Sequence, residues 1–245
     1  MVKFLLPVFV LLSLSTFSQD KLIKYYDSLW TPTSKDSAFF YTEFIKQDTL
    51  YNCFSYWAKS NKLNCKSIYA DTLFNKPRGL FIRNYENGLV QDSSYYYESG
   101  EIKSTYHFYP NGKIWAHYSY NETTKESTSE GFDQQGKKIN DFIYMKEAEF
   151  PGGIQGWKAF ITQNFNTNVP IKNKAHIGVY EVIILFVVSE TGKVIDVKPK
   201  TSFGYGMEEE AMRVIRKSPR WNPLIFLGEK RKAFRVQPFS FAVTQ

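Results

Sequence analysis

Few side chains in this 245-residue chain have the types and spacing that chemistry requires. Its three histidines, His107, His117 and His176, do not stand at the spacings of a metal site. None stands near a serine in the glycine-framed turn of a hydrolase nucleophile. The sequence leaves open a carboxylate pair that folding brings together. The residues themselves predict no enzyme, no metal and no cofactor.

The two cysteines, Cys53 and Cys65, are the next candidates for chemistry. A cysteine pair in an exported chain usually forms a disulfide. A bridge across this short loop would stabilise the fold by about 3 kcal/mol on the loop-entropy model. The alternative is a pair of buried, unreactive thiols. We predict the disulfide.

The first 18 residues have the pattern of a secretory signal peptide. Lys3 precedes an apolar run, and Thr16 and Ser18 are the small residues of a cleavage site. We predict cleavage after Ser18 and export to the periplasm. The alternative is an uncleaved membrane anchor. A spanning helix needs about 20 apolar residues, whereas this run has about 14 and contains Pro7.

The charge of the chain is modestly basic, with a formal net charge of +7. Such an excess can favour nucleic acid or anionic surfaces, but export argues against nucleic acid. Lysine and arginine are spread along the chain except at 230–232, so we interpret them as a solvated face. Aromatic residues make up 18% of the chain, and they suit half-buried strands.

Residues 19–77 form an N-terminal region of mixed helix and strand. Leu22, Tyr25, Tyr26, Leu29 and Trp30 fall near helical spacing, which predicts a short helix over 21–30. Strands are predicted at 38–45, 49–57 and 66–73.

Residues 78–139 contain an internal repeat of twelve residues. Gly88, Gly100 and Gly112 stand twelve residues apart, and Gly136 follows after two more steps. Each of the first three follows a tyrosine by three residues in a turn sequence. Alternating aromatic and polar residues between the turns predict a ladder of antiparallel hairpins. The pattern resembles MORN-type repeats, some of which bind lipid or protein; a purely structural platform is the other interpretation.

The last hundred residues predict a small α/β module over 147–245, with elements in the order helix, strand, strand, helix, strand. Apolar spacing from Ile154 to Phe165 indicates the first helix, and the run from Val179 to Val188 indicates a central strand covered on both faces. A helix follows around 208–217, with acids in its first turn that compensate the helix dipole. The last strand spans about 230–243, where Pro238 marks an edge or a bulge. The whole chain is therefore of the α+β class.

This order of elements resembles the C-terminal domain of TonB, which links inner-membrane energy to outer-membrane transporters. The motif residues that carry the resemblance are Phe150, Pro151, Gly152, Gly153, Trp157, Gly192, Gly204, Gly206, Glu210, Ala211, Pro219, Trp221 and Pro223, with Gly228 and 238–241 completing the series. We interpret them as mainly structural, with aromatic rings in the core and glycines at special backbone positions.

The resemblance implies a function, because in this family the last strand pairs with a short extended segment of an outer-membrane receptor, the TonB box. Carried over, the binding edge comprises Ala233, Phe234, Arg235, Val236, Gln237, Phe239 and Ser240. A homodimer through the same strand is also open. The chain lacks the Pro-rich spacer and the N-terminal membrane helix of a conventional TonB. An exported adaptor is therefore the leading hypothesis, and an energy transducer with an uncleaved N-terminus, or a structural envelope protein, is the alternative.

Overall fold

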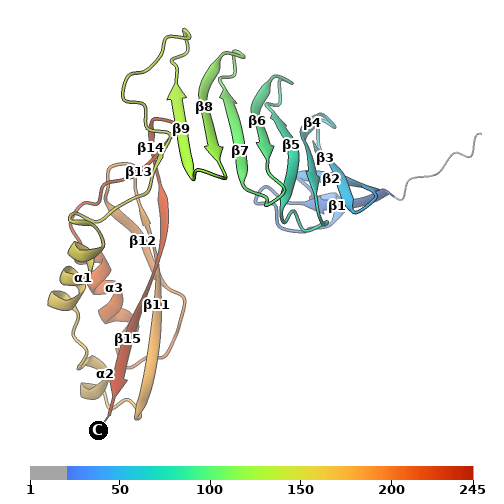
Figure 1. The fold of residues 1–245 in the computed structure, drawn as a ribbon. Coiled ribbons are helices and arrows are strands. Elements are labelled where there is room, and N and C mark those ends of the chain that lie inside the picture. Colours follow the sequence, from blue (N-terminus) through green and yellow to red (C-terminus); the bar gives the residue numbers. More distant parts are fainter. Residues whose placement is uncertain (1–20, 245) are drawn as a thin grey trace, which may run out of the picture. The chain divides into compact units, whose positions relative to one another are not determined.

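The computed structural model describes residues 21–244 (Figure 1). The predicted signal peptide lies outside the described residues. A large antiparallel sheet and a small α/β module make up the described chain, which confirms the α+β class. The chain divides into two compact units between Thr105 and Tyr106.

Nine antiparallel strands form the large sheet, and they stand in it in chain order. These strands are β1 (Lys21–Tyr26), β2 (Phe40–Gln47), β3 (Leu50–Trp57), β4 (Leu63–Tyr69), β5 (Pro77–Asn84), β6 (Val90–Tyr96), β7 (Ile102–Phe108), β8 (Ile114–Asn121) and β9 (Glu126–Gly131), with a 3-10 helix, η1 (Lys35–Ser37), after β1. The three strands predicted in the N-terminal region correspond to β2, β3 and β4, although β4 lies three to four residues earlier in the chain than the predicted strand at 66–73.

The prediction of a helix over 21–30 is wrong. Residues 21–26 form β1, which pairs with β2 along its whole length. The Tyr26 ring is buried, and its centroid lies 5.7 Å from that of Trp30 and 5.5 Å from that of Phe74. Aromatic residues pack equally well on a sheet, so pairing with β2 decides the local structure.

The predicted disulfide is also absent, because Cys53 and Cys65 are both free, buried thiols. Cys53 lies opposite Ser67 on the neighbouring strand, and Cys65 lies opposite Ser55. The two thiols are therefore diagonal neighbours, with Cβ atoms about 7 Å apart, whereas a disulfide needs about 4 Å. Burial raises the pKa of Cys53 to about 12, as expected of an unreactive thiol.

The hairpin ladder predicted from the glycine period is confirmed. Gly88, Gly100, Gly112 and Gly136 have φ between +81° and +92°, and each N–H donates to the carbonyl three residues earlier, at 2.8–3.0 Å. The turn at 121–125, between those of Gly112 and Gly136, lacks glycine, and Lys125 takes the left-handed conformation there, with φ 61°. The kinship with MORN-type repeats stays a prediction.

The joint that follows the repeats, residues 140–150, packs tightly within the second unit. The Tyr144 hydroxyl lies 2.9 Å from His107 Nε2, and the Tyr144 ring stacks on Tyr118 at 4.6 Å. The Phe142 ring lies so close to Gly131 that an added Cβ would stand 2.1 Å from it. The last repeat strands and the joint therefore belong to one packed structure.

The C-terminal module has the predicted order of helices and strands, with short additions. Its elements are α1 (Gly153–Asn164), α2 (Val169–Lys172), β11 (Gly178–Val188), β12 (Val194–Pro199), α3 (Met207–Lys217) and β15 (Ala233–Val243), together with a small sheet of β10 (Met145–Lys146), β13 (Leu224–Phe226) and β14 (Glu229–Arg231). The larger sheet has the antiparallel order β12-β11-β15.

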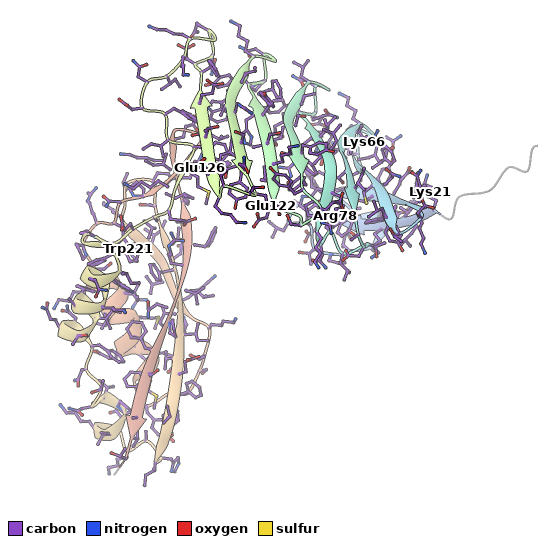
Figure 2. The ribbon with its side chains drawn as sticks, viewed as in Figure 1. Lys21, Lys66, Arg78, Glu122, Glu126 and Trp221 are labelled. Atoms are coloured by element: carbon purple, nitrogen blue, oxygen red, sulfur yellow. The ribbon has the colours of Figure 1, made fainter. Side chains whose placement is uncertain are left out.

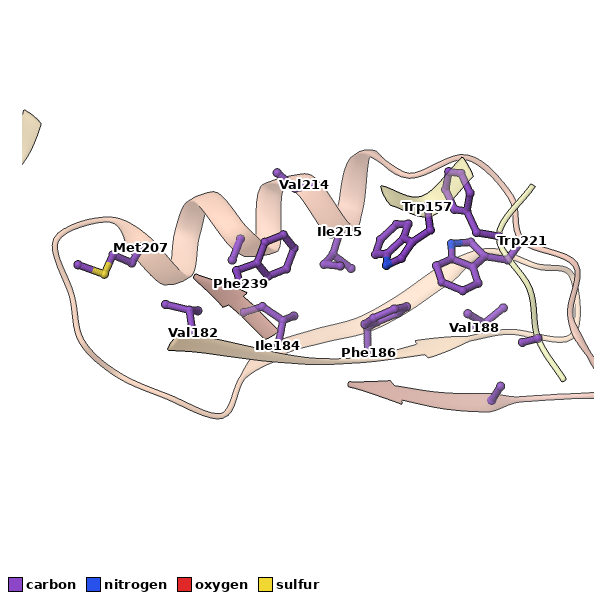
Figure 3. Close-up of a cluster of buried hydrophobic side chains, with 14 of the residues drawn as sticks. Trp157, Val182, Ile184, Phe186, Val188, Met207, Val214, Ile215, Trp221 and Phe239 are labelled. Atoms are coloured by element: carbon purple, nitrogen blue, oxygen red, sulfur yellow. The ribbon is translucent and has the colours of Figure 1, made fainter. Parts of the chain in front are cut away.

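One face of this three-stranded sheet carries the core. Figure 1 shows α1 and α3 on the same face, and Figure 3 shows the side chains between them and β11. The β11 residues in this core are Val182, Ile184, Phe186 and Val188, which meet Val214 and Ile215 of α3. The prediction that β11 is covered on both faces is wrong for its first half. Val179 on the other face is 80% exposed, because none of the described helices covers it.

Candidate functional site: the free edge of β15

The last strand lies at an edge of its sheet and is unusually regular. β15 pairs with β11 over eleven residues, from Ala233 opposite Val188 to Val243 opposite Gly178, without a register shift. β15 has no second neighbour among the described strands. One row of its backbone groups is therefore available to another strand.

The phase of the ladder shows which residues point to this free edge. The Ile183 N–H donates to Thr201 Oγ1 at 3.1 Å, and the Lys200 N–H donates to the Ile183 carbonyl at 2.8 Å. Both backbone groups of Ile183 therefore point toward the β12 side. Pro238, opposite Ile183, must then direct its backbone away from β11. Even-numbered residues of β15 face the free edge, and odd-numbered residues bond to β11.

This alternation divides the predicted site residues into two groups. Phe234, Val236 and Ser240 present backbone groups at the free edge. The other four, Ala233, Arg235, Gln237 and Phe239, bond to β11, and the side chains of Ala233 and Phe239 belong to the core. Pro238 lies on the free edge, so its missing N–H leaves the ladder with β11 intact, as the predicted edge position requires.

The outward side chains of β15 form an apolar surface on the face without helices. Phe234 is 80% exposed and Val236 is 62% exposed. A shallow groove runs beside them, and its walls include Leu185, Val187 and Lys198. Large apolar side chains at such exposure, beside unpaired backbone groups, are typical of a surface that binds another chain.

Two polar side chains on the opposite face of β15 reach its edge carbonyls. Arg235 Nη1 donates to the Phe234 carbonyl at 3.2 Å, and Gln237 Nε2 donates to the Pro238 carbonyl at 2.7 Å. Arg235 Nη2 also donates to the Glu147 carboxylate at 2.7 Å, and the Trp157 indole N–H donates to Gln237 Oε1 at 2.8 Å.

The aromatic residues of the predicted motif form the core beside this strand. Phe150, Trp157 and Trp221 are buried, and their ring centroids lie 5.1–5.5 Å from one another. Trp221 lies beside α1 (Figure 2). A Cβ on Gly192 would stand 2.0 Å from the Trp221 carbonyl, so only glycine fits the turn after β11.

The remaining motif residues take structural positions. Ala211 is fully buried in the core, and Gly152, Gly153, Gly204 and Gly206 all have positive φ. These glycines stand where the chain turns into α1 and α3. Pro151 immediately precedes the first pair, whereas Pro219 and Pro223 lie in the segment between α3 and β13.

The acidic start of α3 does more than compensate the helix dipole. Glu208 is buried and accepts the N–H groups of Phe203 and Gly204 at 2.7 and 3.1 Å. Glu210 accepts the Asn166 N–H at 2.7 Å and two donors of Arg213. Asn166 lies 44 residues from Glu210 in the sequence, and Phe203 and Gly204 lie in an irregular corner. The sequence therefore predicts only the compensation of the helix dipole and not these hydrogen bonds.

No group of three or more histidine, cysteine and acidic side chains that could hold a metal occurs within residues 21–244. His117 Nδ1 lies 3.9 Å from Glu130, and its ring stacks on Tyr106. His176 packs against Tyr205. The helices of this described range also fall short of the length and apolar character that crossing a bilayer requires.

Residues 181–243 match the family model described as the Gram-negative bacterial TonB protein C-terminal. The match confirms the predicted resemblance from β11 to β15 and supports a TonB-like envelope protein-binding module. The repeats and α1 lie outside it. No curated protein matches the chain.

Two solved structures show weak similarity to the chain. A mutant of S. aureus TarM, in complex with Fondaparinux, alpha-GlcNAc-glycerol and UDP, is 17% identical over 42% of this chain and 18% of that chain, with a TM-score of 0.25. Another TarM structure is 17% identical over 43% of this chain and 18% of that chain, with the same TM-score. The chain thus spans under a fifth of either, and such scores carry no argument about fold or function.

Proposed function

We propose that this chain is an exported envelope protein that binds an extended segment of a partner by adding it as a strand to β15. The partner is an outer-membrane receptor or transporter, so the chain serves TonB-linked transport. It acts by binding and catalyses no reaction, and it needs no cofactor and no nucleic acid.

The observation that carries this proposal is the free edge of β15. Eleven residues in unbroken register present one row of backbone groups, and Phe234 and Val236 expose large apolar side chains beside it. In strand addition, backbone hydrogen bonds supply affinity and alternate side chains supply specificity. The family match over 181–243 supports the same mode of binding.

A proline at position 236 tests the proposal directly. Val236 directs its N–H to the free edge, so Val236→Pro removes one edge donor and leaves the ladder with β11 complete. We expect binding of peptides from periplasm-facing segments of the host's outer-membrane receptors to fall at least about ten-fold, the effect of losing about 1.4 kcal/mol. Thermal unfolding should stay close to that of the unchanged chain. Equal binding by a folded Val236→Pro protein would refute strand addition at β15.

The intact mass and cell fraction of the protein separate the adaptor from its alternative. A periplasmic chain that begins near Gln19 supports an adaptor. A full-length chain in the membrane fraction would support an energy transducer held by its N-terminus. If Phe234→Lys and Val236→Pro both keep receptor binding, the result would favour a structural envelope protein.

A further inference from the structure

We propose that the side chains of Arg235 and Gln237 form a guard, in which they occupy backbone acceptors at the free edge of β15. A partner strand displaces these side chains to pair with the first half of β15, residues 233–238. This inference rests on the proposed strand addition and specifies where and how it occurs.

The guard follows from the two carbonyls that its side chains occupy. The Phe234 and Pro238 carbonyls both point to the free edge, and they flank Val236 on its two sides. Arg235 donates to the first and Gln237 donates to the second, at 3.2 and 2.7 Å. A partner strand needs these same acceptors, so each guard bond competes with one intermolecular bond.

Contacts on the helix side hold both guard residues in place. Arg235 Nη2 also donates to the Ala148 carbonyl at 2.9 Å, in addition to its ion pair with Glu147. Gln237 Oε1 accepts the Trp157 indole N–H. Side chains anchored on the core face therefore reach around the edge, which makes the guard a built feature of the module.

Pro238 limits the length of strand that can pair. It offers no N–H to the free edge, so an uninterrupted ladder cannot continue from Val236 to Ser240. The exposed apolar side chains, Phe234 and Val236, both lie before this break. The fitting partner is therefore a short extended segment that ends opposite Pro238. Its side chains on the outer face should be apolar at alternate positions, where they lie next to Phe234 and Val236.

A second copy of the chain fits this edge less well. Two antiparallel copies of β15 centred on Val236 would place Pro238 of each copy opposite Phe234 of the other. Each copy then lacks one donor, so the pair lacks two ladder bonds. A partner segment that ends opposite Pro238 lacks only the one bond that Pro238 cannot donate.

The test measures binding of a fluorescent Thr-Val-Thr-Val-Thr peptide to the full chain. Gln237→Glu keeps an acceptor for the Trp157 indole and removes the donor to Pro238. Arg235→Met removes the donor to Phe234. We expect each to bind about five-fold more tightly, because a net hydrogen bond is worth on the order of 1 kcal/mol. Gln163→Glu and Arg220→Met change charge equally on exposed residues elsewhere and should bind like the unchanged chain.

Two proline variants locate the paired half and separate this inference from the proposed function. Val236→Pro should lose the peptide, whereas Ala242→Pro, at the same phase beyond Pro238, should keep it. Unchanged affinity in both guard variants would overturn the guard while the Val236→Pro loss still supports strand addition. Equal loss in Ala242→Pro would overturn the choice of half.

Undiminished binding by Val236→Pro, or no binding by any variant, would overturn both this inference and the proposed function. Stronger self-association of Gln237→Glu in sedimentation would assign the edge to a second copy.

Discussion

β12 and β15 are the two edge strands of one sheet, and β12 carries more of the features that oppose pairing with another chain. Its ladder with β11 contains a register shift between Leu185 and Val187, and Asp196 adopts φ 53°. Lys198 and Pro199 follow in the same strand. Bulges, lysine and proline are the usual protections of a sheet edge.

β15 lacks most of this protection over its first half. It keeps its register for eleven residues and exposes Phe234 and Val236, and its only proline comes after them. The difference shows that the module leaves one edge available and blocks the other. Because both edges belong to the same packed sheet, the contrast reflects the use of β15 and not weak folding of the module.

The largest expected effect comes from a proline at a position of β15 whose N–H bonds to β11. Gln237 bonds to β11, so Gln237→Pro removes an internal ladder bond and should lower the free energy of unfolding by about 3 kcal/mol. Gln237→Ala separates the lost side-chain bonds from this backbone effect. Val236→Pro should lower it by less than about 1 kcal/mol, because its N–H faces the free edge. Urea unfolding measures all three, and equal losses for the two prolines would refute the assigned ladder phase.

Moving the charge of the β12 edge onto β15 should also remove binding. Val236→Lys places an ammonium group on the exposed apolar surface, where lysine opposes strand pairing. We expect peptide affinity to fall about ten-fold, with little change in stability because position 236 is 62% exposed. Val179→Lys, at a position of β11 that is 80% exposed on the same face, is the matched control and should bind normally. A similar loss in both variants would mean that general charge repulsion, not the edge, controls binding.

Glu210 links α3 to the segment that follows α1, and it makes the stability of the module depend on pH. Burial acts to raise the pKa of Glu210, but hydrogen bonds from Arg213 and from the Asn166 N–H outweigh it and lower the pKa. A lowered folded pKa stabilises the fold above the unfolded value of about 4.3, and this stability is lost as pH falls through the folded pKa. Glu210→Gln should therefore lower stability by about 1–2 kcal/mol at pH 7. The deficit should shrink near pH 3; a deficit that is the same at both pH values would contradict this account.

Local patterns in the sequence were sufficient to predict most of the fold. Turn glycines twelve residues apart fix the hairpins, and the apolar spacing of Trp157, Val214 and Ile215 fixes the helix faces. Features that depend on pairing between strands could not be predicted. Whether Cys53 meets Cys65 depends on the pairing register of β3 and β4. In the observed register, Cys53 lies opposite Ser67, two residues from Cys65. The helical spacing at 21–30 is overridden by pairing with β2.

The candidate site was predictable as a segment but not as a set of residues. Pro238 indicates an edge strand from sequence, yet only the Ile183 contacts reveal which residues face outward. Alternation alone allows two phases, and the choice decides whether Val236 or Gln237 meets a partner. The guard could not be predicted from the sequence either. It consists of hydrogen bonds from the Arg235 and Gln237 side chains to neighbouring backbone carbonyls, and only the fold shows where these side chains point.

The smallest predicted effect comes from weakening the protection of β12. Lys198 borders the groove beside Val236, and Lys198→Val would replace its ammonium group with a β-branched apolar side chain. We expect only a weak rise in self-association, by about two- to five-fold, since a favourable cross-strand pair contributes roughly 0.2–1 kcal/mol. Sedimentation equilibrium would detect it, with Lys158→Val on exposed α1 as the control. The bulge at Asp196 and the proline at 199 remain in this variant, so a large rise would show that charge alone had kept β12 unpaired.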